Sequence, residues 1–273
     1  MKILIAGYST RGFVEAAAHS GGKHQLLALD YFGDRDQAYF ADNYSLIRDF
    51  KGESFTPQEV LKASRQLDFE AVAFASGLEH TPEIVEAIAQ GKLLLGNSPQ
   101  TLRLLQDSQR LYQLLEAKGI PFPRVLFPGQ LIPEGKWLLK KLGKEGGRGI
   151  RPALKGEKVP QGFIGQEYRE GCPASVAFAA DGYRTSILGY SEQLCGQKGF
   201  GAEEFWYGGN LIPLSHPGLK AETRFRIQKM VTVLTREYGL KGLNGIDFLL
   251  LPQGQILFLE INPRYCASME LYW

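Results

Sequence analysis

The chain has 273 residues, of which 44% are hydrophobic and 22% are charged, so it contains enough apolar material for the core of a globular protein. Its 31 basic and 29 acidic residues leave a net charge of +2, without the basic excess typical of nucleic-acid-binding proteins. No apolar segment approaches the roughly 18 residues of a membrane helix, and the three cysteines lie too far apart to suggest a metal site, so we expect a cytoplasmic protein with reduced thiols that binds neither nucleic acid nor membrane.

The first hundred residues alternate short apolar segments with helical patterns. Strands are predicted at residues 2–6, 25–30, 71–75 and 93–95, and helices at residues 10–20, 57–66 and 82–90. Strand–helix alternation with short loops predicts a parallel sheet with both faces covered.

The turn after the first strand has the sequence Gly-Tyr-Ser-Thr-Arg-Gly, at residues 7–12. Dinucleotide-binding proteins carry their glycine-rich turn at this place, but the middle glycine of that pattern is missing here. A tight turn from strand to helix also requires glycine for backbone reasons alone. The turn therefore has two interpretations, a cofactor site and a structural or substrate-facing turn.

A leucine-rich helix is predicted over residues 100–118, opened by Ser98 and Pro99 and ended by Gly119. The prolines at 121 and 123 then force an extended segment, which marks the best candidate for a junction. Beyond it the pattern changes to strands at residues 137–141, 163–168, 174–180, 185–193, 248–251 and 255–261, with one helix at 219–238.

The last two strands carry a group of oxygen-bearing side chains. Glu260 and Asn262 lie two apart and therefore face the same side of a strand. A hairpin that turns near residues 252–254 brings Asp247 beside them. Carboxylate and amide oxygens suit Mg²⁺, and Arg264 would add a cation next to metal-bound phosphates. The alternative is that Asp247 and Asn262 cap turns and Glu260 pairs with a lysine, although an unpaired carboxylate in so apolar a strand is costly.

A second element suits the same ligand. The apolar strand at 137–141 carries Lys140 and is followed by a loop containing Gly146, Gly147 and Gly149. Glycines allow backbone N–H groups to approach phosphate oxygens, and the lysine adds a point charge. The loop is no P-loop, because it lacks the Gly-Lys-Ser/Thr ending, and a solvated hairpin loop is the plainer interpretation.

Taken together, these motifs resemble the ATP-grasp superfamily, and more narrowly its predicted carboligases, whose relatives include D-alanine–D-alanine ligase and biotin carboxylase. The resemblance covers the chain from residue 1 to its end and is strongest over 119–264. It implies an α/β and α+β fold, with an N-terminal parallel-sheet Rossmann-like domain (the pre-ATP-grasp domain) at 1–98. A two-lobed ATP-grasp domain with antiparallel sheets follows at 99–273, with a smaller ATP-binding lobe at 99–170 and a metal-binding lobe at 171–273.

The resemblance also implies roles for individual residues. Lys140 contacts the nucleotide phosphates and the loop with Gly146, Gly147 and Gly149 covers them. The metal ligands are separated by 13 and 15 positions, as in the family, and carry over to Asp247, Glu260 and Asn262. Arg264 binds the substrate carboxylate or the acyl-phosphate. The hinge that contacts adenine carries over to Gln166, Glu167 and Tyr168.

Two positions depart from the family pattern. Ser108 follows Asp107 where ligases often carry lysine, and Pro173 stands where an acidic residue near the ribose is expected. These departures leave one phosphate contact and the ribose contacts open. The chain also ends at Trp273, inside what resembles the start of a helix, so both a truncated metal-binding lobe and a compact natural form are open.

The resemblance implies a ligase that uses ATP and Mg²⁺, with Mn²⁺ as an alternative, to join a small-molecule carboxylate to an amine through an acyl-phosphate. It also allows a homodimer. Two alternatives remain: an ATP-binding sensor or scaffold with impaired catalysis, and an oxidoreductase using the first domain as a nicotinamide site. A glycine-punctuated aromatic loop at residues 200–210 is interpreted either as a lid over the acceptor site or as core packing.

Overall fold

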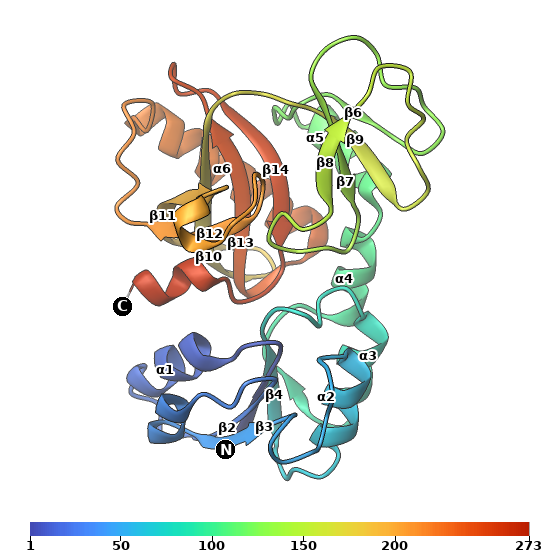
Figure 1. Ribbon diagram of the computed structural model, residues 1–273. Helices are drawn as coiled ribbons and strands as arrows, with labels where there is room; N and C mark the ends of the chain where they lie inside the picture. Colours follow the sequence, from blue (N-terminus) through green and yellow to red (C-terminus); the bar gives the residue numbers. More distant parts are fainter. Residues whose placement is uncertain (273) are drawn as a thin grey trace.

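Residues 1–272 are described by a computed structural model that contains three β-sheets (Figure 1). The first sheet lies in the lower half of the view in Figure 1, and the other two lie in the upper half. Within residues 1–272, no helix combines the length and the apolar character needed to cross a membrane.

The first sheet has five parallel strands in the order β3-β2-β1-β4-β5, which confirms the predicted parallel sheet. Its strands are β1 (Lys2–Ala6), β2 (Gln25–Asp30), β3 (Asp42–Ser45), β4 (Ala71–Phe74) and β5 (Leu93–Leu94). Its helices are α1 (Arg11–His19), α2 (Pro57–Ser64) and α3 (Pro82–Ile88).

Alternating side chains of the central strand β1 supply both cores of this sheet. Ile5 packs with Val14 of α1 on one face, whereas Leu4 packs with Val60 of α2 and Val85 of α3 on the other. Successive residues of a strand point to opposite faces, so an uninterrupted apolar strand is what a sheet covered on both sides requires.

The turn after β1 is held by a side chain from the end of β2. Asp30 is fully buried at the end of β2, and its Oδ2 atom accepts hydrogen bonds from the Thr10 backbone N–H at 3.0 Å and from Thr10 Oγ1 at 2.9 Å. The other oxygen accepts from the Gly33 N–H at 2.7 Å. A nicotinamide-binding domain uses an acidic residue at the end of its second strand for the ribose, and here the Asp30 carboxylate is occupied by Thr10 and Gly33. The geometry therefore favours the structural interpretation of residues 7–12.

The single helix predicted over residues 100–118 is wrong, because the structure has two helices there. Helix α4 (Pro99–Leu105) ends before Gln106, and α5 (Ser108–Ala117) begins after Asp107. The Asp107 side chain accepts a hydrogen bond from the Arg110 N–H at 3.0 Å, and short acidic side chains favour such caps over a helix interior.

The other two sheets are antiparallel. A four-stranded sheet in the order β6-β9-β7-β8 contains β6 (Val125–Leu126), β7 (Trp137–Lys141), β8 (Ile150–Ala153) and β9 (Phe163–Glu167). A five-stranded sheet in the order β12-β11-β10-β13-β14 contains β10 (Cys172–Asp181), β11 (Thr185–Cys195), β12 (Tyr207–Leu211), β13 (Lys241–Leu250) and β14 (Ile256–Asn262).

Several strand predictions need correction. The sequence pattern did not indicate β3, β6, β8 or β12. Strand β8 contains Pro152 and β12 contains two glycines; both strands lie at a sheet edge, where proline and glycine are tolerated. Strand β13 begins at Lys241 rather than at residue 248, so Asp247 lies inside the strand.

Helix α6 (Ala221–Tyr238) covers the five-stranded sheet. Ile227 and Leu234 are fully buried and share a core with Phe178 and Phe248 from the central strands. Burying each such side chain contributes about 1.5–3 kcal/mol, so this core holds the second half of the chain together.

The two halves of the molecule are joined by polar and aromatic contacts. Asn97 donates to Asn244 Oδ1 at 2.7 Å and accepts from the Lys241 N–H at 2.8 Å. Phe13 stacks on Tyr265 with ring centroids 4.6 Å apart. The structure also contains short 3-10 helices at η1 (Arg35–Tyr39), η2 (Lys198–Phe200) and η3 (Ala267–Leu271). Of these, η3 adds to the contact between the two halves, because it lies beside α1 (Figure 1).

Candidate functional site

Asp247, Glu260 and Asn262 lie together on the last two strands. Asp247 in β13 is directly opposite Glu260 in β14, and Asn262 Nδ2 donates to Asp247 Oδ2 at 3.2 Å. The register shifts beside Asp247, since Phe248 pairs with Phe258. This bulge inserts one extra residue into β14 and thereby aligns Glu260 with Asp247.

The carboxyl groups of Asp247 and Glu260 share a poorly hydrated environment. Desolvation raises the pKa of Asp247 above its ordinary value, against hydrogen bonds from Gln193 and Asn262. Desolvation also raises the pKa of Glu260, which the Asp247 charge raises further and the Lys140 charge opposes. Two carboxyl groups held this closely repel each other, and a nearby cation stabilises their charged forms.

Lys140 lies close to the acidic pair on the neighbouring sheet. Its Nζ atom donates to Gln166 Oε1 at 3.4 Å, and Gln166 Nε2 donates to Tyr112 Oη at 3.5 Å. Burial and then the charge of Glu260 raise the pKa of Tyr112. Lys140, the predicted phosphate ligand, therefore contacts Gln166, the first predicted hinge residue. It also lies near enough to Glu260, a predicted metal ligand, for the two charges to interact.

The glycine-rich loop after β7 docks on the start of β12 and on the two aromatic residues before it, Phe205 and Trp206. The Gly146 carbonyl accepts a hydrogen bond from the Tyr207 N–H at 3.0 Å, and the Arg148 guanidinium lies 5.1 Å from the centre of the Trp206 ring. Gly147 has φ +75°, and a Cβ atom there would lie 1.8 Å from the Phe205 carbonyl oxygen. Glycine is therefore required at 147, and the aromatic segment lies over the loop rather than packing wholly in the core.

The outer hinge residues are engaged in other contacts. Glu167 forms an ion pair with Arg124 at 3.1 Å, and its N–H donates to the Arg124 carbonyl. The exposed side chain of Tyr168 lies near Lys136, whose carbonyl accepts the Tyr168 N–H. Gln166 is thus the hinge residue whose side chain the structure brings to Lys140, and the other two lie outside that contact.

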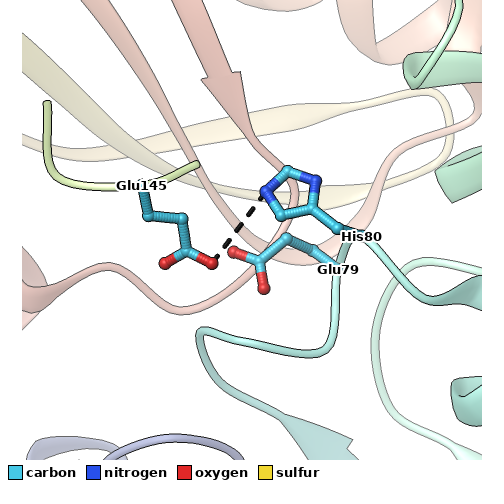
Figure 2. Close-up of side chains that lie close together, drawn as sticks. All are labelled: Glu79, His80 and Glu145. Carbon is cyan, nitrogen blue, oxygen red and sulfur yellow. Dashed lines mark ion pairs between the residues drawn. The ribbon is translucent and has the colours of Figure 1, made fainter. Parts of the chain in front are cut away.

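Arg264 connects the acidic pair to the first half of the chain. Its side chain is 11% exposed; Nε pairs with Glu79, while Nη2 donates to Glu145 Oε2 at 3.2 Å and to Asn262 Oδ1 at 3.3 Å. Burial alone would lower the pKa of Arg264, but the negative groups around it, Glu79 foremost and Glu145 among the others, raise it above its ordinary value. Figure 2 shows Glu79, His80 and Glu145 converging from the two halves of the molecule.

Several residues of this region were not predicted. Glu79 carries no sequence signal, because it is brought to Arg264 only by the tertiary fold. Glu145 had a signal, since an acidic residue is unexpected in a loop that resembles a phosphate-binding loop. Ser175 and Ser191 also extend the polar row, because Ser175 is opposite both Ser191 and Asp247 in the sheet.

The donor set fits a magnesium ion. Two carboxylates and one amide oxygen on paired strands are hard ligands, and the desolvated pair of Asp247 and Glu260 has a charge that a divalent cation would balance. Asn262 Oδ1 now accepts from Arg264, so Asn262 would turn its amide to offer that oxygen to a cation.

The chain is similar to several known proteins. A family described as ATP-grasp domain matches residues 105–268. The arginine-specific large chain of carbamoyl phosphate synthase from Bacillus subtilis is 24% identical over 285 residues, covering 91% of this chain and 26% of that protein.

Two solved structures share the fold. The biotin carboxylase complex with β,γ-ATP from Campylobacter jejuni has a TM-score of 0.75 at 16% identity, covering 98% of this chain and 66% of that one. The biotin carboxylase domain dimer of Hydrogenobacter thermophilus 2-oxoglutarate carboxylase, with MgADP, ADP and bicarbonate, has a TM-score of 0.73 at 18% identity, covering 99% and 66%. The chain thus spans about a quarter of the length of the synthase subunit and about two thirds of the carboxylase chains.

These likenesses agree with the observed sheets, and the family match covers more than half of the sequence. The chain belongs to the ATP-grasp family.

Proposed function

We propose that this protein is an ATP- and Mg²⁺-dependent ligase that joins a small-molecule carboxylate to an amine through an acyl-phosphate. The observation that supports this most directly is the direct opposition of Asp247 and Glu260 beside Lys140. The carboxylase domain with MgADP and bicarbonate provides a parallel, because it binds the same nucleotide class with a small anion. Because that carboxylase domain forms a dimer, we also propose that this protein is a homodimer. We expect it to be cytoplasmic.

Each residue of the site has a place in this reaction. Lys140 and the N–H groups of the loop with Gly146, Gly147 and Gly149 bind the phosphates, and Gln166 lies at the inner end of the hinge. Glu167 and Tyr168 line the outer hinge. Asp247, Glu260 and Asn262 would hold Mg²⁺, or alternatively Mn²⁺, which neutralises phosphate charge when bound.

The proposed reaction has two steps. A substrate carboxylate oxygen attacks the γ-phosphorus of ATP, so that an acyl-phosphate forms and ADP leaves. The amine nitrogen then attacks the carbonyl carbon, the bond to the phosphate oxygen breaks, and inorganic phosphate leaves while the nitrogen loses a proton. Arg264 stabilises the negative charge of the carboxylate and of the acyl-phosphate, and the protein contributes chiefly through positioning and charge.

A catalytically impaired nucleotide-binding protein is the second candidate. It is favoured by one structural observation: Asp107 is used as the cap of α5, and Ser108 beside it supplies no cation for a phosphate. Such a protein would bind ATP without transferring its phosphoryl group.

Hydroxylamine trapping distinguishes these candidates without knowledge of the amine. The protein is incubated with Mg-ATP, hydroxylamine and a panel of small carboxylic acids, and hydroxamate and phosphate are measured. The ligase forms a hydroxamate with at least one acid; binding of the non-hydrolysable analogue AMPPNP with no hydroxamate or phosphate across the panel supports the second candidate. Absence of Mg-AMPPNP binding would contradict both.

The variant Glu260→Gln tests the acidic pair directly. We expect Mg-dependent AMPPNP affinity to fall by about 100-fold or more, because even residues that only support a metal ligand contribute about 10–100-fold. Asp181→Asn is the matched control, since Asp181 caps an exposed turn of the same sheet. Equal nucleotide affinity in the two variants would contradict the proposed metal role of Glu260.

A further inference from the structure

Glu145 extends from the glycine-rich loop to the other half of the molecule. Its Oε1 atom accepts a hydrogen bond from the Gly77 N–H at 3.2 Å, and its Oε2 atom accepts from Arg264 Nη2 at 3.2 Å. His80 Nε2 lies 3.9 Å from Oε1 (Figure 2). Each oxygen of one carboxylate therefore has its own donor, from segments far apart in the sequence.

The donors are arranged as a site for a carboxylate. A guanidinium and a backbone N–H that converge on one anion form charge-assisted hydrogen bonds of defined direction. Gly77 has φ +95°, and a Cβ atom there would lie 2.6 Å from the Phe55 ring, so the backbone geometry that aims this N–H requires glycine. The same N–H also donates to Glu79 Oε2 at 2.7 Å.

Glu145 is not needed to neutralise the charge of Arg264. The charge of Arg264 is already matched by the buried Glu79, and ligand atoms of Glu79, His80 and Glu145 lie within 4.8 Å of one another. Burial and the Glu79 charge raise the pKa of Glu145 to about 7, against the effect of Arg264. A cation among these three residues is not needed to explain the cluster, because Arg264 provides the positive charge.

We propose that Glu145 is an internal ligand of Arg264 and Gly77, and that the substrate carboxyl group competes with it for these two donors. This inference rests on the proposed function, since it concerns the acid that the ligase activates. Entry of the acid displaces Glu145 and releases the loop from the first half of the molecule. Acid binding and loop opening are therefore coupled, whereas nucleotide contacts of the loop are made by its glycines.

Acetate serves as the probe, because it presents a carboxyl group and little else. Its affinity is measured by calorimetry at constant ionic strength with chloride as the balancing anion, for the wild type, Glu145→Ala and the control Glu134→Ala. Glu134 is an exposed partner of Lys155 in the same sheet region, so its removal changes the net charge equally. If the Glu145 carboxylate occupies Arg264 and Gly77 about 90% of the time, Glu145→Ala should bind acetate about tenfold more tightly than the wild type and Glu134→Ala.

Trypsin provides a second measurement that does not depend on affinity. Lys144 and Arg148 flank the contact and are exposed, so cleavage at these two residues reports release of the loop. Acetate accelerates this cleavage in the wild type, and Glu145→Ala is cleaved faster without acetate and is unaffected by it. Equal acetate affinity in the wild type and Glu145→Ala, or cleavage that acetate leaves unchanged in the wild type, would overturn the inference.

Failure of the proposed role of Glu145 can be distinguished from failure of the proposed ligase function. Mg-AMPPNP binding is measured on the same samples: a protein that binds the nucleotide normally but shows no acetate competition contradicts the role of Glu145 alone. A protein that binds no nucleotide contradicts the ligase itself.

Discussion

Arg264 and Glu79 form a buried ion pair across 185 positions of the sequence, with side chains 11% and 3% exposed. The pair joins the loop after β4 to the segment after β14, so the arginine beside the proposed metal ligands is oriented by the first half of the molecule.

Removing the charge of Glu79 is expected to destabilise the protein. Glu79→Gln leaves Arg264 with Glu145 as its remaining carboxylate partner, so the cost should lie toward the lower end of the about 3–5 kcal/mol that breaking a buried pair costs. Urea unfolding at neutral pH measures this change. Glu86→Gln is the matched control, because Glu86 pairs with Arg103 at the surface and such pairs contribute about 1 kcal/mol or less.

The cost of Glu79→Gln should depend on pH. Burial alone would raise the pKa of Glu79, but Arg264 outweighs burial and holds that pKa below its ordinary value. The stabilisation is therefore present above the pKa of Glu79 in the unfolded chain and is lost as pH falls through the lower pKa of the folded state. The difference in unfolding free energy between the wild type and Glu79→Gln should shrink below about pH 4, and a difference that grows there would contradict the ion pair.

Two glycines of the phosphate-covering loop should respond differently to alanine. Both Gly143 and Gly147 have positive φ, but a Cβ atom at 143 meets nothing within 4 Å, whereas at 147 it would lie 1.8 Å from the Phe205 carbonyl oxygen. Gly143→Ala should cost about 1–2 kcal/mol of backbone strain. Gly147→Ala should in addition detach the loop from the aromatic segment and weaken AMPPNP binding by about tenfold, or about 1.4 kcal/mol, as measured by calorimetry. Similar affinities in the two variants would show that docking on Phe205 does not support nucleotide binding.

Two neighbouring lysines of β7 allow a specific phosphate contact to be distinguished from a general effect of positive charge. Lys140 points toward Gln166 and the acidic pair, whereas Lys141 is exposed. A hydrogen bond to a charged group contributes about 1.5–3 kcal/mol, so Lys140→Met should reduce AMPPNP affinity by about tenfold or more. Lys141→Met should change it little, and an equal loss in both variants would indicate a non-specific charge effect.

The three thiols should react slowly in the folded protein. Burial raises the pKa of Cys172 to about 11 and that of Cys266 to about 12, and it also raises the pKa of Cys195. Only the thiolate attacks a disulfide reagent, so little reaction with Ellman's reagent is expected at pH 8. All three thiols should react promptly in guanidinium chloride, and fast native reaction of Cys266 would contradict its half-buried, poorly hydrated position beside Arg264.

Local sequence patterns predicted a large part of the fold. The apolar segments and turn residues identified the parallel sheet, most antiparallel strands and the helix that became α6. The two-residue spacing of Glu260 and Asn262, with Asp247 on the preceding strand, also predicted that these three residues lie together on paired strands. These features depend on side-chain alternation and turn geometry over short stretches, which the order of residues specifies directly.

Other features arise only when distant segments pack together. The bulge that aligns Glu260 with Asp247 adds one residue to β14, and hydrophobic alternation does not reveal it. The break at Asp107 is different, because it is local: the Asp107 side chain caps α5 and competes with helix propagation, which the helical periodicity of the leucines does not reveal.

The residues around Arg264 show the same division most clearly. Its motif near the end of the chain indicated an anion-binding cation, but its partners Glu79 and Glu145 lie 185 and 119 positions away. Neither distance follows from periodicity, since each depends on how the first sheet and the glycine-rich loop pack against the closing strands. Short-range patterning thus determined which side chains share a strand face, and the packing of whole sheets decided which charges meet, because burial and Coulomb interactions act between segments that the chain order keeps apart.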